Sequence, residues 1–293
     1  MTHLPDLRRQ LGAAPIARDV VRVQGPEAIE FLQGQLSQDV AGLAVDDSAP
    51  SLLLQPTGKV DAWLRATRLA PDEVLLDVDQ GHGEAVLARL RRFRLRTKAD
   101  LALEHWSGLA LRGPGARDVE PPAGALALDA AWPGVPAVDL LSPGELALAG
   151  VALVPAEALE ALRIECGVPA MGAELTDATI PAEAGQWLID ASVSFTKGCY
   201  TGQELVARID SRGGNVPRPI RGLRLADDGV PRGATVEGGE GQAVGEVTSV
   251  GRSPVLGPVA LAVVSRAVEP DTEVAVEWDG GRTTATVTAL PMR

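Results

Sequence analysis

The stretch Glu273-Val274-Ala275-Val276-Glu277-Trp278-Asp279-Gly280-Gly281 predicts a β-hairpin, because Asp279-Gly280 is a turn signal between two β-rich runs. The second of those runs is Thr283–Ala289. Further short runs of the same kind precede the hairpin, divided by glycine, proline and aspartate: Arg221–Leu225, Ala234–Glu237, Gly245–Val250 and Val259–Val264. Short strands at such spacing predict a small antiparallel β-barrel over residues 220–293, with a domain boundary near Pro219.

Residues 1–219 mix helix and strand signals, so the chain as a whole is expected to be of the α+β class. A hairpin turn is predicted at Pro56-Thr57-Gly58-Lys59. Strands are expected at 20–23, 73–78, 95–103, 108–111 and 145–149. Helices are expected after Gly25-Pro26, over 84–93 and over 155–166, the last ended by Gly167.

The composition of the 293 residues excludes several classes of protein. A hydrophobic content of 45% is too high for a disordered chain, and a net charge of −12 argues against direct, charge-driven nucleic-acid binding. Two cysteines make neither a disulfide framework nor a permanent iron–sulfur cluster, and the three scattered histidines suggest no metal site. Without a signal-peptide layout or an apolar run of ~20 residues, we expect a soluble cytoplasmic protein with no membrane partner.

Six cations stand between residues 89 and 98 of this acidic chain: Arg89, Arg91, Arg92, Arg94, Arg96 and Lys98. The simpler interpretation is a solvated helix face that continues into an edge strand, where alternating arginines discourage aggregation. The functional interpretation is a dock for an anionic tail, a phosphate or an acidic partner.

The scarcest residue types of the chain meet in Lys197-Gly198-Cys199-Tyr200, which holds one of three lysines, one of two cysteines and the only tyrosine. Thr201 and Glu204 form a capping-box pattern, so Cys199 is expected just before a helix N-terminus. The helix dipole and the Lys197 ammonium would both favour the thiolate. We therefore interpret Cys199 as a functional thiol, against the alternative of a buried cysteine in a turn, which suits Cys166 better.

Arg163, at the end of the predicted helix, and Glu183, in a Pro/Gly-rich loop, form a second candidate site. A guanidinium binds carboxylates, and a carboxylate accepts paired N–H donors from a heteroaromatic ring such as the edge of a pterin or a guanine. A purely structural Arg–Glu contact explains the same residues equally well, so the residues alone leave this open.

Three blocks of the sequence resemble the folate-binding relatives of the glycine-cleavage T-protein, and more closely the YgfZ-type family. The first two blocks, Gly25–Val40 and Arg163–Gly185, resemble segments shared by the wider superfamily. The third, Lys197-Gly198-Cys199-Tyr200-Thr201-Gly202-Gln203-Glu204, matches every fixed position of the YgfZ signature and is highly specific. The resemblance covers most of the chain, and residues 100–155 add little to it.

This resemblance implies a ring-like, T-protein-like folate-binding unit over residues 1–219, in two interleaved lobes, followed by the C-terminal barrel. It implies tetrahydrofolate, or a one-carbon derivative, as the bound cofactor. Arg163 and Glu183 become candidate folate contacts. Lys197, Tyr200, Gln203 and Glu204 shape the loop of Cys199, Lys197 as a candidate catalytic residue and the other three as further candidate cofactor contacts. Asp61 lies near the position of the catalytic carboxylate of T-proteins.

The leading hypothesis is therefore a tetrahydrofolate-binding accessory protein in iron–sulfur cluster assembly or repair, including clusters of tRNA-modifying enzymes, with those enzymes or assembly proteins as partners. The rival is a folate-dependent aminomethyltransferase that uses Asp61. T-proteins typically have Asp-Phe where this chain has Cys199-Tyr200, which counts against that rival. A third possibility is a folate sensor or scaffold without chemistry.

Overall fold

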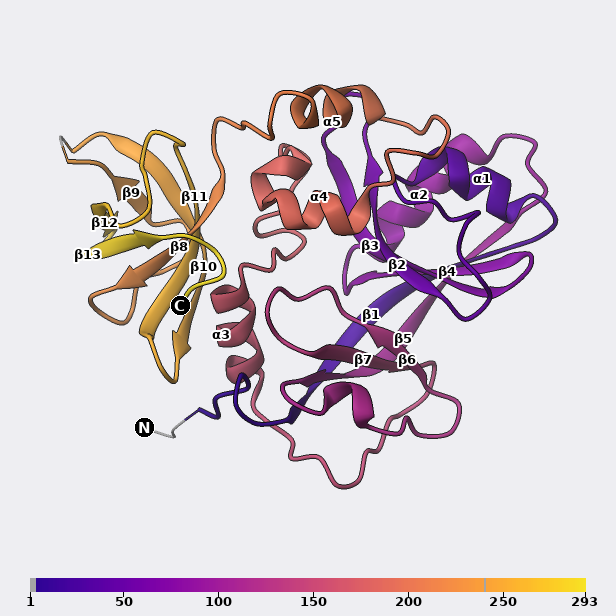
Figure 1. Cartoon of the computed structure of the whole chain (residues 1–293), viewed down its shortest axis with the longest axis horizontal. Helices are drawn as coiled ribbons and strands as arrows, with labels where there is room; N and C mark the ends of the chain where they lie inside the picture. The colour runs from indigo at the N-terminus through magenta and orange to yellow at the C-terminus, as the bar shows by residue number, and fades with distance from the viewer. Residues whose placement is uncertain (1–3, 240) are drawn as a thin grey trace.

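The computed structural model describes residues 4–239 and 241–293 and contains two β-structures with helices between them. Figure 1 shows the barrel on one side, the large sheet with α1 and α2 on the other, and α3 and α4 between the two. This arrangement confirms the expected α+β class with a C-terminal antiparallel barrel.

The large sheet has the strand order β2-β3-β4-β1-β5-β7-β6, and every neighbouring pair is antiparallel. Its strands are β1 (Gly12–Gln24), β2 (Ser48–Leu54), β3 (Val60–Ala70), β4 (Glu73–Asp79), β5 (Asp100–Arg112), β6 (Leu126–Asp129) and β7 (Ala137–Ser142). β1 pairs with β5 along its full length, from Gly12 opposite Arg112 to Gln24 opposite Asp100. This long central pair sets the register for the polar side chains described below.

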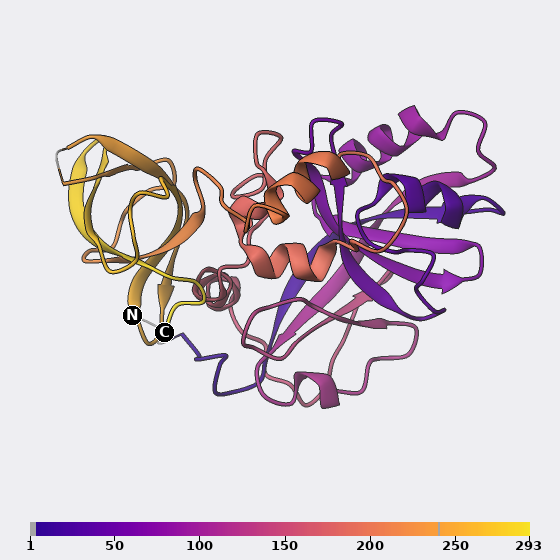
Figure 2. The ribbon, with the colours of Figure 1, turned by 45° about the horizontal axis from the view of Figure 1, so that its top comes forward.

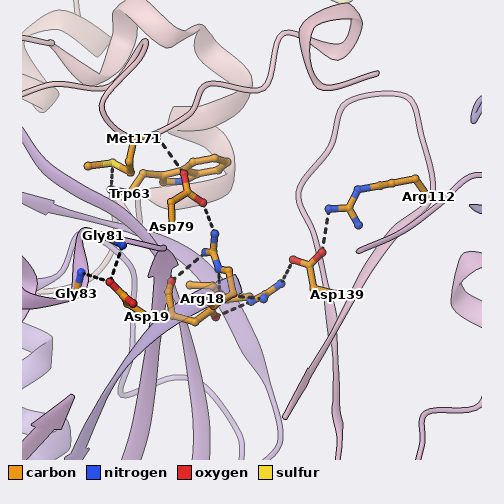
Figure 3. A network of polar contacts seen from close by, with 11 residues as sticks. Arg18, Asp19, Trp63, Asp79, Gly81, Gly83, Arg112, Asp139 and Met171 are labelled. Carbon is orange, nitrogen blue, oxygen red and sulfur yellow. Dashed lines mark hydrogen bonds and ion pairs between the residues drawn. The ribbon is translucent and has the colours of Figure 1, made fainter. Parts of the chain in front are cut away.

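Two helices, α1 (Ala28–Gln35) and α2 (Gly83–Arg94), cover one face of this sheet. Successive strand residues point to opposite faces, so Val21 and Val23 of β1 pack with Leu32 and Leu90 of the helices, while Val20 belongs to a separate cluster on the other face. The buried carboxylate of Asp19 accepts the N–H groups of Gly81 and Gly83 and so caps α2 (Figure 3).

The barrel is closed in the order β10-β11-β8-β13-β12-β9, as the ring in Figure 2 shows. Its strands are β8 (Ile220–Leu225), β9 (Thr235–Glu237), β10 (Ala243–Ser253), β11 (Gly257–Val264), β12 (Glu273–Trp278) and β13 (Gly281–Thr288). Alternate valines, alanines and leucines fill its interior, because a small closed barrel has room only for side chains. The predicted hairpin corresponds to β12 and β13, which turn at Asp279-Gly280.

The helix α3 (Ala156–Cys166) packs against the barrel strands β10 and β11 and holds the barrel against the rest of the molecule. A Cβ on Gly251 of β10 would lie 2.9 Å from Ile164, so the helix approaches the strand as closely as glycine allows. Met292 donates its N–H to the carbonyl of Glu165 at 2.7 Å and fixes the C-terminal segment there. Gly167 ends α3 in a left-handed conformation, as the sequence predicted.

Local details differ from the expectations in three places. Residues 145–149 form no strand, and residues 95–99 are a loop outside the sheet, so the predicted strands at 95–103 and 108–111 are replaced by the single long strand β5. The helix α4 (Gln186–Ser192) and the strands β6 and β7 had no clear local signal. The chain also forms short 3-10 turns at Ala116–Asp118 and Pro181–Ala184.

Candidate functional site

A cavity with a volume of about 410 Å³ lies between the large sheet and α3. Its walls come from β1, β3, the end of β4, the loop between β6 and β7, and one face of α3. The side chains that bear on its chemistry are Trp63, Asp79, Arg112, Trp132, Glu160 and Arg163. A cavity of this size suits a small-molecule ligand.

A ladder of alternating charges forms one wall of this cavity (Figure 3). Arg18 and Arg65 both bind Asp77 at 2.9 Å, and Arg65 and Arg112 bind Asp139 at 3.1 and 2.8 Å. Burial alone would raise the pKa of Asp139, but the guanidinium groups of Arg112, Arg65 and Arg18 lower it to about 2. Asp139 therefore stays ionised between Arg65 and Arg112, and these ion pairs orient the side chains of this wall.

One further carboxylate, that of Asp79, extends the ladder to the cavity surface. Asp79 pairs with Arg18 and also accepts the N–H of Met171 at 3.1 Å. Its side chain is 40% exposed, so it faces the cavity while these contacts fix its orientation. A carboxylate held in this way can accept N–H donors from a ligand.

Two tryptophans supply the aromatic part of the cavity. Trp132 lies over the guanidinium of Arg112, 4.2 Å from the ring centroid, and Trp63 donates its indole N–H to Ser192 at 3.0 Å. Trp63 also meets Trp187 edge-on, with ring centroids 6.0 Å apart. Both rings are thus fixed by neighbours, and they provide flat apolar surfaces against which a heteroaromatic ring can pack.

Arg163 lines the cavity, and of the residues predicted to contact folate it alone does so. Its guanidinium binds Glu160 at 2.6 Å, Glu174 at 3.1 Å and the hydroxyl of Ser249 in β10 at 2.6 Å. Arg163 therefore makes a structural Arg–Glu contact, as one of the two interpretations predicted. Its acidic partners are Glu160 and Glu174, not Glu183. Glu160 remains 41% exposed on the cavity side.

Glu183 is buried in another place, outside the cavity lining. Its carboxylate accepts the backbone N–H of Ile180 at 3.0 Å and so caps the short turn Pro181–Ala184. Burial raises the pKa of this carboxyl group, and the hydrogen bond from Ile180 and the charges of Arg218 and Lys59 oppose that shift. The geometry gives Glu183 a structural contact and no direct route to a ligand in the cavity.

The segment Lys197–Glu204 lies at the molecular surface beside the end of α1, and the thiol of Cys199 is exposed. Lys197 does not face that thiol: its ammonium donates to the carbonyls of Gln33, Leu36 and Gln38 at 2.6, 2.7 and 3.0 Å. Burial lowers the pKa of Lys197 to about 8, against the opposing charge of Asp39. Lys197 therefore anchors the loop to α1.

The expected capping box of Thr201 and Glu204 is not formed. The helix α5 (Gln203–Asp210) begins after Gly202, which occupies the N-cap with φ +84°, and Glu204 is exposed. No side chain caps α5, and the side-chain oxygen of Gln203 instead accepts the N–H of Tyr200 at 3.0 Å, in the loop before the helix. Cys199 thus lies four positions before the helix, further from its dipole than the sequence suggested.

Tyr200 is half-buried against the cluster beneath α4 and α5, and its ring lies 5.2 Å from the Lys197 ammonium. Burial raises the pKa of its hydroxyl group to about 12. The other cysteine, Cys166, is buried beside Arg8, and burial raises its thiol pKa to about 11, as befits an inert core residue.

Asp61 binds Arg89 of α2 at 3.0 Å, outside the cavity lining. Arg89 also reaches the side chain of Gln35 at 3.3 Å and the carbonyl of Leu54 at 3.2 Å. The same end of α1 accepts the N–H of Thr201 at Gly34, 3.2 Å away. Asp61, Arg89 and the end of α1 that holds the Cys199 loop therefore adjoin one another. Arg89 is the first residue of the basic run at 89–98, but the sequence did not indicate this contact.

Comparison with known proteins places this fold in a defined class. Residues 18–125 match the family model described as the GCVT N-terminal domain, and residues 218–292 match the glycine cleavage T-protein C-terminal barrel domain. A solved glycine cleavage system aminomethyltransferase T from Bartonella henselae superposes with a TM-score of 0.81 at 26% identity, covering 97% of this chain and 87% of that one.

Two curated relatives are similar to this chain over most of its length. An aminomethyltransferase from Parafrankia sp. is 30% identical over 309 residues, spanning 92% of this chain and 82% of its own. The tRNA-modifying protein YgfZ from Edwardsiella ictaluri is 28% identical over 306 residues, spanning 92% of this chain and 89% of its own. The chain belongs to the glycine cleavage T-protein-like family, whose GCVT-type domain implies tetrahydrofolate binding in the family. No helix of the described residues is long and apolar enough to cross a membrane.

Proposed function

We propose that this protein is a tetrahydrofolate-binding accessory protein in iron–sulfur cluster assembly or repair, with Cys199 as its functional thiol. The observation that carries the folate part is the cavity between the sheet and α3, where two fixed tryptophan rings adjoin oriented carboxylates. The observation that carries the thiol part is the exposure of Cys199 in a loop with the complete YgfZ signature.

The cavity residues fit the parts of a folate by their chemistry. The pterin ring is flat and heteroaromatic and carries paired N–H donors, which suit Trp63 or Trp132 beside the carboxylates of Asp79 or Glu160. We assign the acceptor role to these two acids in place of Glu183, because both line the cavity and Glu183 does not. Bound tetrahydrofolate would supply one-carbon carrier chemistry, while the protein holds and orients it.

The exposed thiol suits a reaction with another macromolecule. Cys199 does not line the cavity, so its exchange partner must come from solvent, as a protein-bound cluster or sulfur carrier would. The YgfZ relative is named as a tRNA-modifying protein, and enzymes of tRNA modification that hold iron–sulfur clusters are candidate clients in this proposal.

The thiol role is tested by exchanging each cysteine separately in cells that lack the native protein. Cys199→Ala should fail to restore the activity of iron–sulfur enzymes, including tRNA-modifying ones, while folate binding stays intact. Cys166→Ala is the matched control, because that thiol is buried beside Arg8 and should restore activity when the protein accumulates normally. Full restoration by Cys199→Ala would refute the thiol role.

A second candidate, a folate-dependent aminomethyltransferase, is favoured by the relatives' name and by Asp61. Asp61 is ion-paired with Arg89, which holds its carboxylate in one orientation. Purified protein with tetrahydrofolate and an aminomethylated lipoyl carrier should then release ammonia, and Asp61→Asn should abolish the release. Absence of turnover in the unaltered protein would remove this candidate.

A non-catalytic folate sensor or scaffold is the remaining alternative. It predicts that alkylation of the exposed Cys199 leaves both folate binding and cellular function unchanged. Loss of cellular function with folate binding intact would separate the thiol-dependent accessory role from a pure scaffold.

A further inference from the structure

The C-terminal end of α2 and the loop after it form an exposed surface, here called the basic tip, that differs from the rest of this acidic chain. It consists of Arg91, Arg92, Phe93, Leu95, Arg96 and Lys98, all exposed. Within the described residues, the side chains of Arg92, Arg96 and Lys98 make no ion pair and no hydrogen bond. The acids at its border are Asp100, 3.8 Å from Arg94, and Glu27, which accepts the N–H of Lys98.

Leu95 marks the basic tip as more than a solvated helix face. Its side chain is 87% exposed, and its φ of +47° lies in the left-handed region that residues other than glycine rarely adopt. Phe93, 36% exposed, lies beside it under the guanidinium of Arg89. Apolar and arginine side chains together are enriched at the centres of protein–protein interfaces.

The position of the basic tip relates it to the candidate thiol. Arg89, two residues before it on α2, binds Gln35 at the end of α1, and Gly34 in that same end accepts the N–H of Thr201 in the Cys199 loop. The helix that carries the basic tip is therefore connected to the Cys199 loop through the end of α1.

We propose that the basic tip docks an acidic protein partner, with Leu95 and Phe93 entering an apolar depression between its carboxylates. A protein fits better than a nucleic acid, because the most exposed tip residue is an aliphatic side chain unsuited to base stacking. A membrane fits less well than a protein, because membrane binding scales with buried apolar area and only Leu95 and Phe93 of the tip are apolar. The inference that the docked partner then reacts at Cys199 rests on the proposed function. Docking itself is measured without folate or thiol chemistry.

The experiment measures fluorescence anisotropy of labelled probes on the full chain at two salt concentrations. The principal probe is a 20-residue amphipathic helical peptide with leucine on one face and glutamate on the other. Its comparison probes are the same residues in scrambled order, a 20-base-pair DNA duplex, and vesicles of phosphatidylcholine with phosphatidylserine. We expect the amphipathic peptide to bind most tightly and more weakly at high salt.

Two variants test the named side chains. Arg92→Glu with Arg96→Glu should weaken peptide binding by about tenfold or more, whereas Arg212→Glu with Arg266→Glu, the same charge change at exposed sites elsewhere, should not. Leu95→Gly should weaken binding while the melting temperature stays level or rises, because glycine accepts the left-handed backbone. Cys199→Ser should leave binding unchanged, so failure of the thiol role and failure of docking give different results.

Three outcomes would overturn the proposal. Tighter binding of the DNA duplex, lost in the double variant, would make the basic tip a nucleic-acid surface. Tighter binding of the vesicles would make it a membrane-contact surface. Equal binding of the ordered and scrambled peptides, unaffected by either variant, would show that the basic tip is only solvated.

Discussion

The ammonium of Lys197 lies 2.7 Å from the carbonyl oxygen of Leu36, and this contact fixes the thiol loop to the end of α1. The last carbonyls of a helix have no partner within it. Here Lys197, distant in sequence, donates to the carbonyl of Gln33 in the last turn of α1, to that of Leu36 at its C-cap and to that of Gln38 just beyond. The lysine two residues before the cysteine thus has a structural role: Lys197 positions the loop that presents Cys199.

Replacement of Lys197 by methionine should loosen this loop. The loss of hydrogen bonds to the buried and half-buried carbonyls should lower the free energy of unfolding by about 1–3 kcal/mol above pH 8. Below pH 8 the loss should be smaller, because removal of the buried charge offsets part of it. The reaction of Cys199 with a thiol reagent should become faster, because the loop that holds it is less ordered. Lys98→Met, at an exposed lysine, is the control and should change neither quantity. Unchanged thiol reactivity in Lys197→Met would contradict the anchoring role.

The lowered pKa of Lys197 determines how its contribution to the free energy of unfolding changes with pH. Burial lowers its pKa in the folded protein to about 8, from an ordinary value of 10.5, so between these values the unfolded chain binds more protons than the folded one. Its contribution to the unfolding free energy should therefore rise with pH across this window and be least favourable below pH 8. NMR titration of the lysine side chains should show a transition near pH 8 that Lys197→Met lacks. No transition below pH 10 would contradict the burial argument.

Gly202 and Gly198 make a matched pair of alanine substitutions in the same loop. A Cβ on Gly202 would lie 2.6 Å from the carbonyl oxygen of Gln55, and its φ is +84°, so Gly202→Ala should destabilise the protein by about 1–3 kcal/mol. Gly198 has nothing within 4 Å of a Cβ, so Gly198→Ala should be nearly neutral. Urea unfolding measures both changes in the free energy of unfolding. Equal effects would show that Gly202 does not pack tightly against the backbone at Gln55.

Asp139→Asn tests the charge ladder in the cavity wall. The substitution leaves Arg65 and Arg112 buried with less negative charge, so we expect a loss of about 3–5 kcal/mol of unfolding free energy. Asp129→Asn, at an exposed pair with Arg117, should cost less than about 1 kcal/mol. Chemical denaturation distinguishes the two.

Because the pKa of Asp139 is lowered from 3.8 to about 2, its stabilising effect should be complete above pH 3.8 and be lost as the pH falls toward 2.

The parts of this molecule that depend on local signals could be predicted from the sequence, and those that depend on long-range register could not. The barrel was predictable because its strands follow one another with turn residues between them. The ladder brings together Arg18, Asp77 and Asp139 from three different strands, and their meeting depends on the pairing of β1 with β4 and β5 and of β5 with β7. The prediction that Glu183 contacts folate rests on its place in the Arg163–Gly185 block, and no local signal indicates that its carboxylate is buried against Ile180 in its own turn.

Titration of the purified protein with 5-formyl-tetrahydrofolate tests most directly whether the cavity between the sheet and α3 binds folate. The unaltered protein should bind, Trp132→Ala should weaken binding by about tenfold or more, and Glu183→Gln should leave it unchanged, because Trp132 lines the cavity and Glu183 caps a turn outside it. Loss of binding in Glu183→Gln with full binding in Trp132→Ala would contradict this account and place the ligand elsewhere.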